Sequence, residues 1–293
     1  MDMPVPKPNT AITHTLSRKM LNPEQFIQLS EFITTNYGIK LPEHKKVMVE
    51  GRLQKRLKEL QLESFAEYID LVLGHEETEE VVHMINAVST NKTDFFRESA
   101  HFDFMNEVLL PSLFAEKRAG DIKIWSSAAS TGEEIYTIAM VMEEFMKKHK
   151  LTHRSYRILG TDISVDALHT AINGVYNIAR LINMSQQLKK EYFLKSKDLN
   201  KPIVRVKPEL RAKTAFGRLN LMDEEYKLED TYDIIFCRNV LIYFDRENQD
   251  KVISRLVKKL KPGGYLFVGH SESLFRTATN LKLVKPTIYQ KAL

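Results

Sequence analysis

Polar side chains directly follow a predicted buried strand in the stretch FCRNVLIYFD, residues 236–245. The strand-like residues 231–237 run into Arg238 and Asn239, and Tyr243 follows in the same loop. A doubly wound sheet binds its ligand at the carboxyl ends of its strands. We therefore expect this guanidinium, amide and phenol to face a ligand.

A loop of small residues, SAASTGEE, spans residues 127–134 after a strand predicted over residues 121–126. Small residues let the backbone approach a ligand closely at the start of the following helix. The loop lacks the GxGxxG pattern of dinucleotide-binding proteins, and Glu133 and Glu134 would repel phosphate. The pattern favours a ligand without phosphate groups.

Asp162 stands at the end of the next predicted strand, residues 156–161. A carboxylate there can accept hydrogen bonds from both hydroxyls of a ribose. It can equally cap the helix predicted over residues 164–172, and Asp162 alone does not separate the two roles. The small-residue loop favours ribose binding. An adenosine without phosphates, beside carboxylates that can hold an amino group, indicates S-adenosylmethionine.

A third polar stretch, STNKTDFFRE, covers residues 89–98 and precedes the predicted sheet. Asn91 and Thr93 carry short hydrogen-bonding side chains, and Arg97 carries a planar fork that matches a carboxylate. Spacing alone favours a simpler role, a linker whose two phenylalanines lie in a core.

Two reactive residue types have simple interpretations. Methyl transfer from a sulfonium needs no covalent enzyme intermediate, so we interpret Cys237 as a packing residue. His270, in GHSES, resembles half of a His-Ser hydrolase pair, but the chain has no G-x-S-x-G stretch, and we assign His270 a structural role. We expect no metal site.

The composition limits the fold and the partners. A chain of 293 residues that is 43% hydrophobic can bury two modest cores, so we expect two domains. The 43 basic and 38 acidic residues nearly balance, and a net charge of +5 does not indicate a nucleic-acid-binding tail. The single cysteine excludes an internal disulfide, and no apolar run reaches membrane-span length, so we expect a soluble cytoplasmic protein.

Periodicity divides the chain into a flexible tail (1–22), a helical domain with its linker (23–98) and an α/β domain (99–293). Apolar stripes and caps predict helices over residues 23–37, 43–60, 64–73 and 76–88. Strands and helices then alternate, which indicates a parallel sheet covered by helices. An inserted subdomain (174–213) interrupts the alternation, with a helix at 186–193 and a strand at 203–206. Closely spaced strands at 281–284 and 287–289 must pair antiparallel.

Five stretches of the sequence are informative in their order and spacing: STNKTDFFRE, WSSAASTGEE, LGTDIS, FCRNVLIYFD and GGYLFVGHSES. Together they resemble the bacterial chemotaxis receptor methyltransferases of the CheR family, over nearly the whole chain from about residue 24 to 291. The resemblance implies an α/β fold: a Rossmann-like class I methyltransferase sheet with a C-terminal antiparallel hairpin, an inserted small subdomain and an N-terminal all-helical domain. It also implies a protein-glutamate O-methyltransferase that uses S-adenosylmethionine to esterify glutamates on the cytoplasmic helical region of chemoreceptors.

By motif position, the resemblance implies nine residues that contact the cofactor: Asn91, Thr93, Arg97, Glu134, Asp162, Asn220, Leu221, Arg238 and Asn239. Arg97 and Tyr243 would also face the substrate as the catalytic residues. A glutamate carboxylate is ionised at neutral pH, so it can attack the methyl carbon without a general base. Arg97 can orient that carboxylate and Tyr243 can donate a hydrogen bond to it, and this alignment should supply most of the acceleration.

The helix predicted over residues 43–60 carries Lys45, Arg52, Lys55 and Arg56 beside its apolar stripe. A solvated face is the ordinary explanation of such charges. The resemblance implies that receptor methylation regions are long acidic helical bundles, and the helical domain has no other evident purpose. We therefore predict that these four side chains recognise the substrate.

Two other functions remain open. A nucleic-acid methyltransferase shares the sheet and the cofactor, although an amino-methylating member would carry a polar-Pro-Pro-aromatic loop where this chain has Arg-Asn-Val-Leu. The other is an adaptor that binds the cofactor but has no activity. The presence of both Arg97 and Tyr243 argues against it.

The expected partners follow from the preferred function. We expect a monomer that binds neither nucleic acid nor the membrane interior. In some CheR family members the inserted subdomain binds a receptor's C-terminal peptide through a glycine-containing turn. The corresponding stretch, LKSKDLNKP at residues 194–202, has no glycine, which argues against such tethering here.

Overall fold

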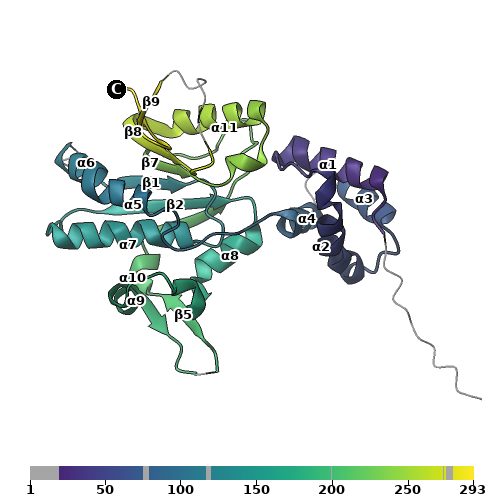
Figure 1. Ribbon diagram of the computed structural model, residues 1–293, viewed down its shortest axis with the longest axis horizontal. Helices are drawn as coiled ribbons and strands as arrows, with labels where there is room; N and C mark the ends of the chain where they lie inside the picture. The colour runs from purple at the N-terminus through teal and green to yellow at the C-terminus, as the bar shows by residue number, and fades with distance from the viewer. Residues whose placement is uncertain (1–19, 75–78, 117–119, 199, 273, 275–279) are drawn as a thin grey trace, which may run out of the picture.

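A seven-stranded sheet forms the centre of the molecule, in the order β6-β2-β1-β7-β8-β10-β9 (Figure 1). The computed structural model describes residues 20–74, 79–116, 120–198, 200–272, 274 and 280–293. Pairing is parallel from β6 through β8, and β10 is antiparallel to both β8 and β9. The strands are β1 (Ile122–Ser126), β2 (Tyr156–Asp162), β6 (Thr214–Arg218), β7 (Tyr232–Cys237), β8 (Leu260–Val268), β9 (Leu281–Lys285) and β10 (Ile288–Lys291). The predicted parallel sheet with a C-terminal hairpin is confirmed.

The central strand β7 requires helices on both faces of the sheet, because all six of its residues are buried. Successive side chains of a strand point to opposite faces. Ile234 and Phe236 accordingly join one apolar cluster, with helix α7 (Glu133–Lys148), whereas Ile235 joins another, with helix α11 (Arg246–Lys259). Figure 1 shows these two helices on opposite sides of the sheet.

Other helices complete the two layers. Helix α8 (Val165–Asn173) lies on the same side of the sheet as α7 and contacts β2 and β6. A continuous helical segment leads into β1, with a π-helical turn between two α-helical pieces: α5 (Ala100–Phe104), η2 (Met105–Leu109) and α6 (Leu110–Glu116).

Four helices at one end of the sheet share a separate apolar core (Figure 1). They are α1 (Pro23–Tyr37), α2 (Lys46–Glu59), α3 (Phe65–Leu73) and α4 (Glu79–Val88), with the 3-10 turn η1 (Glu43–Lys45) before α2. Helix α1 has the predicted bounds because its ends are well capped. Asn22 and Gln25 form a reciprocal capping box, and Gly38 ends the helix with a φ of 69°.

The inserted subdomain contains a small antiparallel sheet of order β3-β5-β4. Its elements are β3 (Val175–Asn177), η3 (Ile178–Leu181), α9 (Gln186–Tyr192), β4 (Phe193–Lys195), β5 (Ile203–Val206) and α10 (Pro208–Arg211). The predicted short helix and the strand at 203–206 are both present.

Some elements differ from the sequence predictions. Strand β6 was not predicted, because TAFGR lacks apolar alternation and its side chains are only partly buried at the sheet edge. The helical segment from α5 to α6 was also missed. The predicted tail lies almost wholly outside the described residues, as does the start of the helix predicted from residue 76. Among the described residues, no helix is long and apolar enough to cross a membrane.

Two arginines of α2 hold the helical core together. Arg56 pairs with the buried carboxylate of Glu80, which also accepts a hydrogen bond of 2.9 Å from the Tyr68 hydroxyl. Arg52 donates to three backbone carbonyl groups at the end of α4, those of Ala87, Val88 and Ser89. Their guanidinium groups therefore have internal partners, unlike the open basic face that the sequence suggested.

We predict that Arg56→Ala lowers the free energy of unfolding by roughly 3 kcal/mol, because it leaves the Glu80 carboxylate buried without its cation. Lys55→Ala is the matched control. Lys55 is largely exposed and lies 3.6 Å from Glu59, so its loss should cost under about 0.5 kcal/mol. Urea unfolding followed by circular dichroism measures both changes, and equal effects would contradict the structural role of Arg56.

Candidate functional site

A pocket opens at the carboxyl ends of β1, β2 and β7 and is also lined by the segment between α1 and α2. It holds about 1100 Å³ of empty space, part of it open to solvent, which is ample for a nucleoside-sized ligand. Its lining includes every residue predicted to contact cofactor or to act in catalysis: Asn91, Thr93, Arg97, Glu134, Asp162, Asn220, Leu221, Arg238, Asn239 and Tyr243. Lys45 lines the pocket as well, whereas Arg52, Lys55 and Arg56 are not among its lining residues.

Asp162 braces the loop after β1. Its carboxylate accepts hydrogen bonds from the backbone N–H of Ser130 at 2.7 Å and of Ser164 at 2.9 Å. Helix α8 is capped by Ser164 itself, whose hydroxyl accepts from the Ala167 N–H, so Asp162 is not the N-cap. Each carboxylate oxygen has two lone-pair sites, so Asp162 can hold this loop and still accept ribose hydroxyls. Burial raises the pKa of Asp162.

Left-handed backbone conformations gather around the pocket. Ser130, Asn239 and Glu98 have φ values of 49°, 58° and 57°. Such conformations cost non-glycine residues about 1–3 kcal/mol each and persist where surrounding contacts fix them. Gly132 has a φ of 95°, and a Cβ there would come within 2.8 Å of the Ala171 Cβ. The loop backbone is thereby held close to the pocket.

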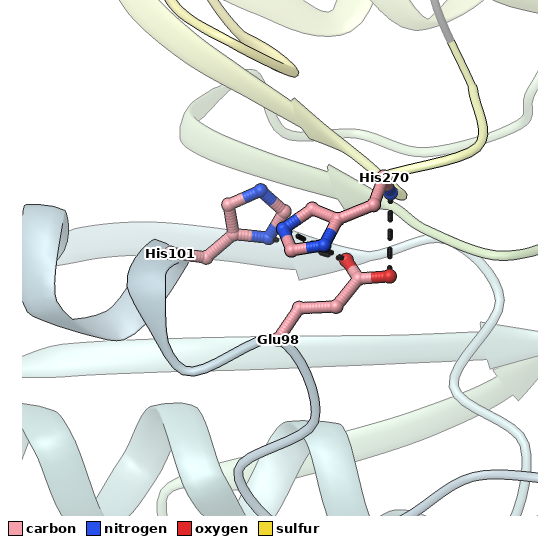
Figure 2. Close-up of side chains that lie close together, drawn as sticks. All are labelled: Glu98, His101 and His270. Atoms are coloured by element: carbon pink, nitrogen blue, oxygen red, sulfur yellow. Dashed lines mark hydrogen bonds and ion pairs between the residues drawn. The ribbon is translucent and has the colours of Figure 1, made fainter.

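Glu98 stands between the pocket wall and two histidines, His101 and His270 (Figure 2). Its carboxylate accepts from the Asn239 amide at 3.1 Å and from the backbone N–H of His270 at 3.2 Å, and it pairs with Arg238 at 3.0 Å. Burial acts to raise the pKa of Glu98, but the Asn239 hydrogen bond and the Arg238 charge outweigh it and lower the pKa to about 2. Glu98 is therefore ionised at neutral pH.

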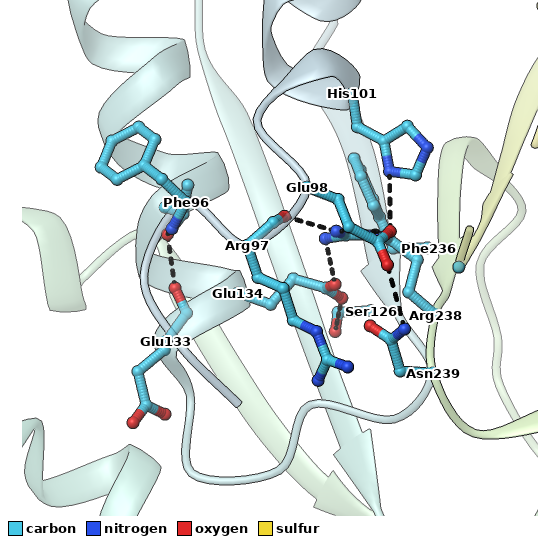
Figure 3. A network of polar contacts seen from close by, with 12 residues as sticks. Phe96, Arg97, Glu98, His101, Ser126, Glu133, Glu134, Phe236, Arg238 and Asn239 are labelled. Carbon is cyan, nitrogen blue, oxygen red and sulfur yellow. Dashed lines mark hydrogen bonds and ion pairs between the residues drawn. The ribbon is translucent and has the colours of Figure 1, made fainter. Parts of the chain in front are cut away.

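Arg238 connects three segments of the wall (Figure 3). Its buried guanidinium pairs with Glu134 at 2.8 Å and with Glu98, and donates to the backbone carbonyl of Arg97. Glu134 also accepts a hydrogen bond of 2.8 Å from the Ser126 hydroxyl. Burial raises the pKa of Glu134, and the Arg238 charge opposes that shift. The arrangement fixes the Glu134 carboxylate at the start of α7, beside the loop of small residues after β1.

Glu272 shapes the loop that carries the polar residues after β7. Its buried carboxylate accepts from the backbone N–H groups of Gly269 at 2.6 Å, Asn239 at 2.8 Å and Ile242 at 3.3 Å. Sequence reasoning missed Glu98 and Glu272 as organising residues. In the sequence, Glu98 is the last residue of STNKTDFFRE and Glu272 lies within GHSES, so both belong to motifs that were recognised for other residues.

The predicted catalytic residues approach the pocket from different elements. Arg97 donates from its guanidinium to the Lys92 carbonyl at 3.0 Å, and in Figure 3 its side chain extends away from the Arg238 network. Tyr243 is half-buried, and its backbone carbonyl accepts from the Lys40 N–H at 3.0 Å. The Lys45 ammonium lies 5.6 Å from the centre of the Tyr243 ring. A cation and a phenol thus meet at this side of the pocket.

Four predicted cofactor residues also make structural contacts. Asn91 donates to the Ser164 hydroxyl, and the Thr93 carbonyl accepts from Arg180 of the inserted subdomain. The Asn220 amide donates to the Asn36 carbonyl at the end of α1, and the Leu221 carbonyl accepts from the Tyr226 hydroxyl. These contacts join the α1–α4 helices and the insertion to the pocket wall.

Cys237 is fully buried, and burial raises the pKa of its thiol. A buried thiol of raised pKa forms little thiolate and is a poor nucleophile. The interpretation of Cys237 as a packing residue is confirmed.

The side chains fit the cofactor predicted from the sequence. Asp162 offers carboxylate oxygens for hydroxyl donors, and Ala128 keeps the loop after β1 free of bulk. Glu134 places a carboxylate where it can accept from an ammonium group. The three residues suit the ribose, the adenine and the amino acid moiety of S-adenosylmethionine, respectively, in the order Asp162, Ala128 and Glu134.

Two family models and several curated proteins match nearly the whole chain. Residues 91–290 match the family model for the CheR methyltransferase, SAM binding domain, and residues 24–89 match the model for the CheR methyltransferase, all-alpha domain. The chemotaxis protein methyltransferase of Borreliella burgdorferi is 38% identical to this chain, over 92% of this chain and 94% of its own length. Those of Salmonella typhimurium and Escherichia coli are 33% and 36% identical, over 99% and 93% of this chain and 98% and 92% of their own lengths.

We predict that Asp162→Ala weakens the binding of S-adenosylhomocysteine by roughly 1–3 kcal/mol, because ribose hydroxyls lose a buried acceptor. It should also lower stability, since two backbone N–H groups lose their partner. Titration calorimetry measures the affinity, and Asp166→Ala, an exposed aspartate in the first turn of α8, is the control. Lower stability with unchanged affinity would mean that Asp162 only braces the loop.

Proposed function

The chain belongs to the CheR methyltransferase family, and from that premise we propose that it methylates glutamate side chains of chemoreceptors. The products would be glutamate methyl esters and S-adenosylhomocysteine. One observation carries the proposal: the predicted catalytic residues, Arg97 and Tyr243, line the same pocket as all of the predicted cofactor residues.

The arrangement suits a transfer that needs alignment more than acid or base. S-adenosylmethionine supplies an activated methyl group when it is bound. An ionised glutamate is already a nucleophile, so the enzyme must hold one oxygen in line with the methyl group and remove water from it. Arg97 would orient the carboxylate through its fork of donors, and the Tyr243 hydroxyl would donate to the same group.

The other arginine of the pocket lining, Arg238, already has two carboxylate partners. Arg238 is bound to Glu98 and Glu134, so its guanidinium is committed to the wall. Arg97, in contrast, is only partly buried and lies at the pocket lining. This difference supports Arg97 over Arg238 as the group that meets an incoming carboxylate.

We propose the domain division predicted from the sequence: a helical domain with its linker (23–98), whose linker contributes Arg97 to the pocket, and a methyltransferase domain (99–293). Within the first unit, Lys45 and Lys55 are the better candidates for contact with an acidic receptor helix in the cytoplasm. Lys45 lies beside Tyr243, and Lys55 is largely exposed. Arg52 and Arg56 are left out, because their guanidinium groups bind α4 and Glu80.

We predict that Tyr243→Phe lowers kcat about tenfold, the equivalent of one hydrogen bond of about 1.4 kcal/mol in the transition state. The affinity for S-adenosylhomocysteine should stay near the wild-type value, because the hydroxyl acts on the nucleophile. Methylation of receptor fragments with labelled cofactor gives kcat, and calorimetry gives the affinity. A parallel loss of both would remove Tyr243 from the catalytic role.

We predict that the double change Lys45→Glu and Lys55→Glu raises the KM for receptor fragments, and raises it more at low salt than at high salt. Exposed charges act over a Debye length of about 8 Å at physiological ionic strength, so added salt screens the effect. Lys258 is an exposed residue of α11, and Lys258→Glu, the matched control, should leave KM unchanged. A KM that is insensitive to the double change at low salt would show that this face is merely solvated.

A further inference from the structure

Three potential metal ligands meet behind the pocket wall (Figure 2). Glu98 precedes α5, His101 belongs to α5, and His270 follows β8. One ligand atom from each lies within 4.8 Å of the other two, the one such group among the described residues. The Glu98 carboxylate is 3.7 Å from His101 Nδ1 and 4.0 Å from His270 Nε2.

The hydrogen bonds of Thr287 determine which nitrogen of His101 carries the proton. The Thr287 hydroxyl donates to the Pro286 carbonyl at 2.6 Å, so its oxygen must accept from His101 Nε2–H at 2.8 Å. His101 Nδ1 then presents a lone pair toward the Glu98 carboxylate, 3.7 Å away. This is the tautomer that binds a metal through Nδ1, with the other nitrogen held by a protein acceptor.

The Nδ1 lone pair has no partner among the described residues. His101 is 1% exposed, and its Nδ1 is buried without a hydrogen bond. It faces the Glu98 carboxylate, whose oxygens are acceptors, at 3.7 Å. Two acceptors that face each other repel unless a proton or a cation lies between them.

We propose that Glu98, His101 and His270 bind a divalent transition metal ion, with zinc as the best match. Zinc takes imidazole nitrogen and carboxylate oxygen at about 2.0–2.2 Å, which places tetrahedral ligand atoms roughly 3.4 Å apart. The two carboxylate–imidazole separations, 3.7 and 4.0 Å, are close to this value, and all three ligand atoms lie within 4.8 Å of one another, so metal binding would draw the three groups together. The His270 side chain is 56% exposed, which gives the metal an entry path and a position for water.

The surrounding charges accommodate a dication. The positive charge of Arg238 is paired with two carboxylates, those of Glu98 and Glu134. Glu98 also holds the Asn239 amide, which lines the cofactor pocket. A metal on Glu98 would share that carboxylate with Arg238 and so bind directly behind the cofactor wall.

Metal titration of the full, untagged chain tests the site. We expect Co²⁺, added to protein freed of metal with a chelator, to give the visible absorption of a four-coordinate nitrogen and oxygen site at one ion per chain, and Zn²⁺ to displace it. His270→Ala should weaken binding at least tenfold. His169→Ala, an exposed histidine on α8, is the matched control and should bind as the wild type does.

A second variant tests the contribution of the buried ligand, His101. His101→Gln, checked for folding by circular dichroism, should weaken Co²⁺ binding as His270→Ala does. The proposal is overturned if the wild type gives no such absorption, or if the wild type and His270→Ala bind Co²⁺ equally. These measurements need neither cofactor nor receptor, so their outcome does not depend on whether the proposed methylation is correct.

Discussion

The buried guanidinium of Arg238 is the interaction on which the rest of the site depends. It pairs with Glu134 at the start of α7 and with Glu98 before α5, and it donates to the Arg97 carbonyl. Two segments that are distant in the sequence, residues 97–98 and the start of α7, are thereby fixed at the end of β7. Loss of one partner from such a buried set is costly, because it leaves an uncompensated charge. The strained backbone at Glu98 and Asn239 can persist because this network holds both residues in place.

The α1–α4 helices are part of the site through a small number of specific contacts. The Lys40 N–H donates to the Tyr243 carbonyl, and the Asn220 amide donates to the Asn36 carbonyl. Arg52 binds the end of α4, directly before the stretch that contains Asn91 and Arg97. The helical unit therefore forms one wall of the pocket, and its residue Lys45 lies 5.6 Å from the centre of the Tyr243 ring.

Most elements could be predicted because their causes are local. The capping box at Asn22 fixes the start of α1, and polar residues after β7 share an edge with Asp162 because parallel strands end together. The remainder depends on partners remote in the sequence. Arg52 and Arg56 look like a solvated basic face until α4 is folded against them. The meeting of His101 with His270 likewise requires α5 to lie against β8, which no periodicity in either segment indicates.

The inserted subdomain is joined to the loop between β1 and α7 by a hydrogen bond and to the start of α7 by an ion pair. Arg180 of η3 donates to the Thr93 carbonyl at 2.7 Å and pairs with the buried Glu133 at the start of α7. The Tyr176 hydroxyl of β3 donates to the Thr131 carbonyl at 2.7 Å, inside the loop that Asp162 braces. Because the Glu133 carboxylate is buried, displacement of η3 would be opposed by the loss of its pair with the partly exposed Arg180. The insertion is therefore held in place against the loop between β1 and α7. In the sequence, the insertion is visible only as an interruption of the alternation of strands and helices.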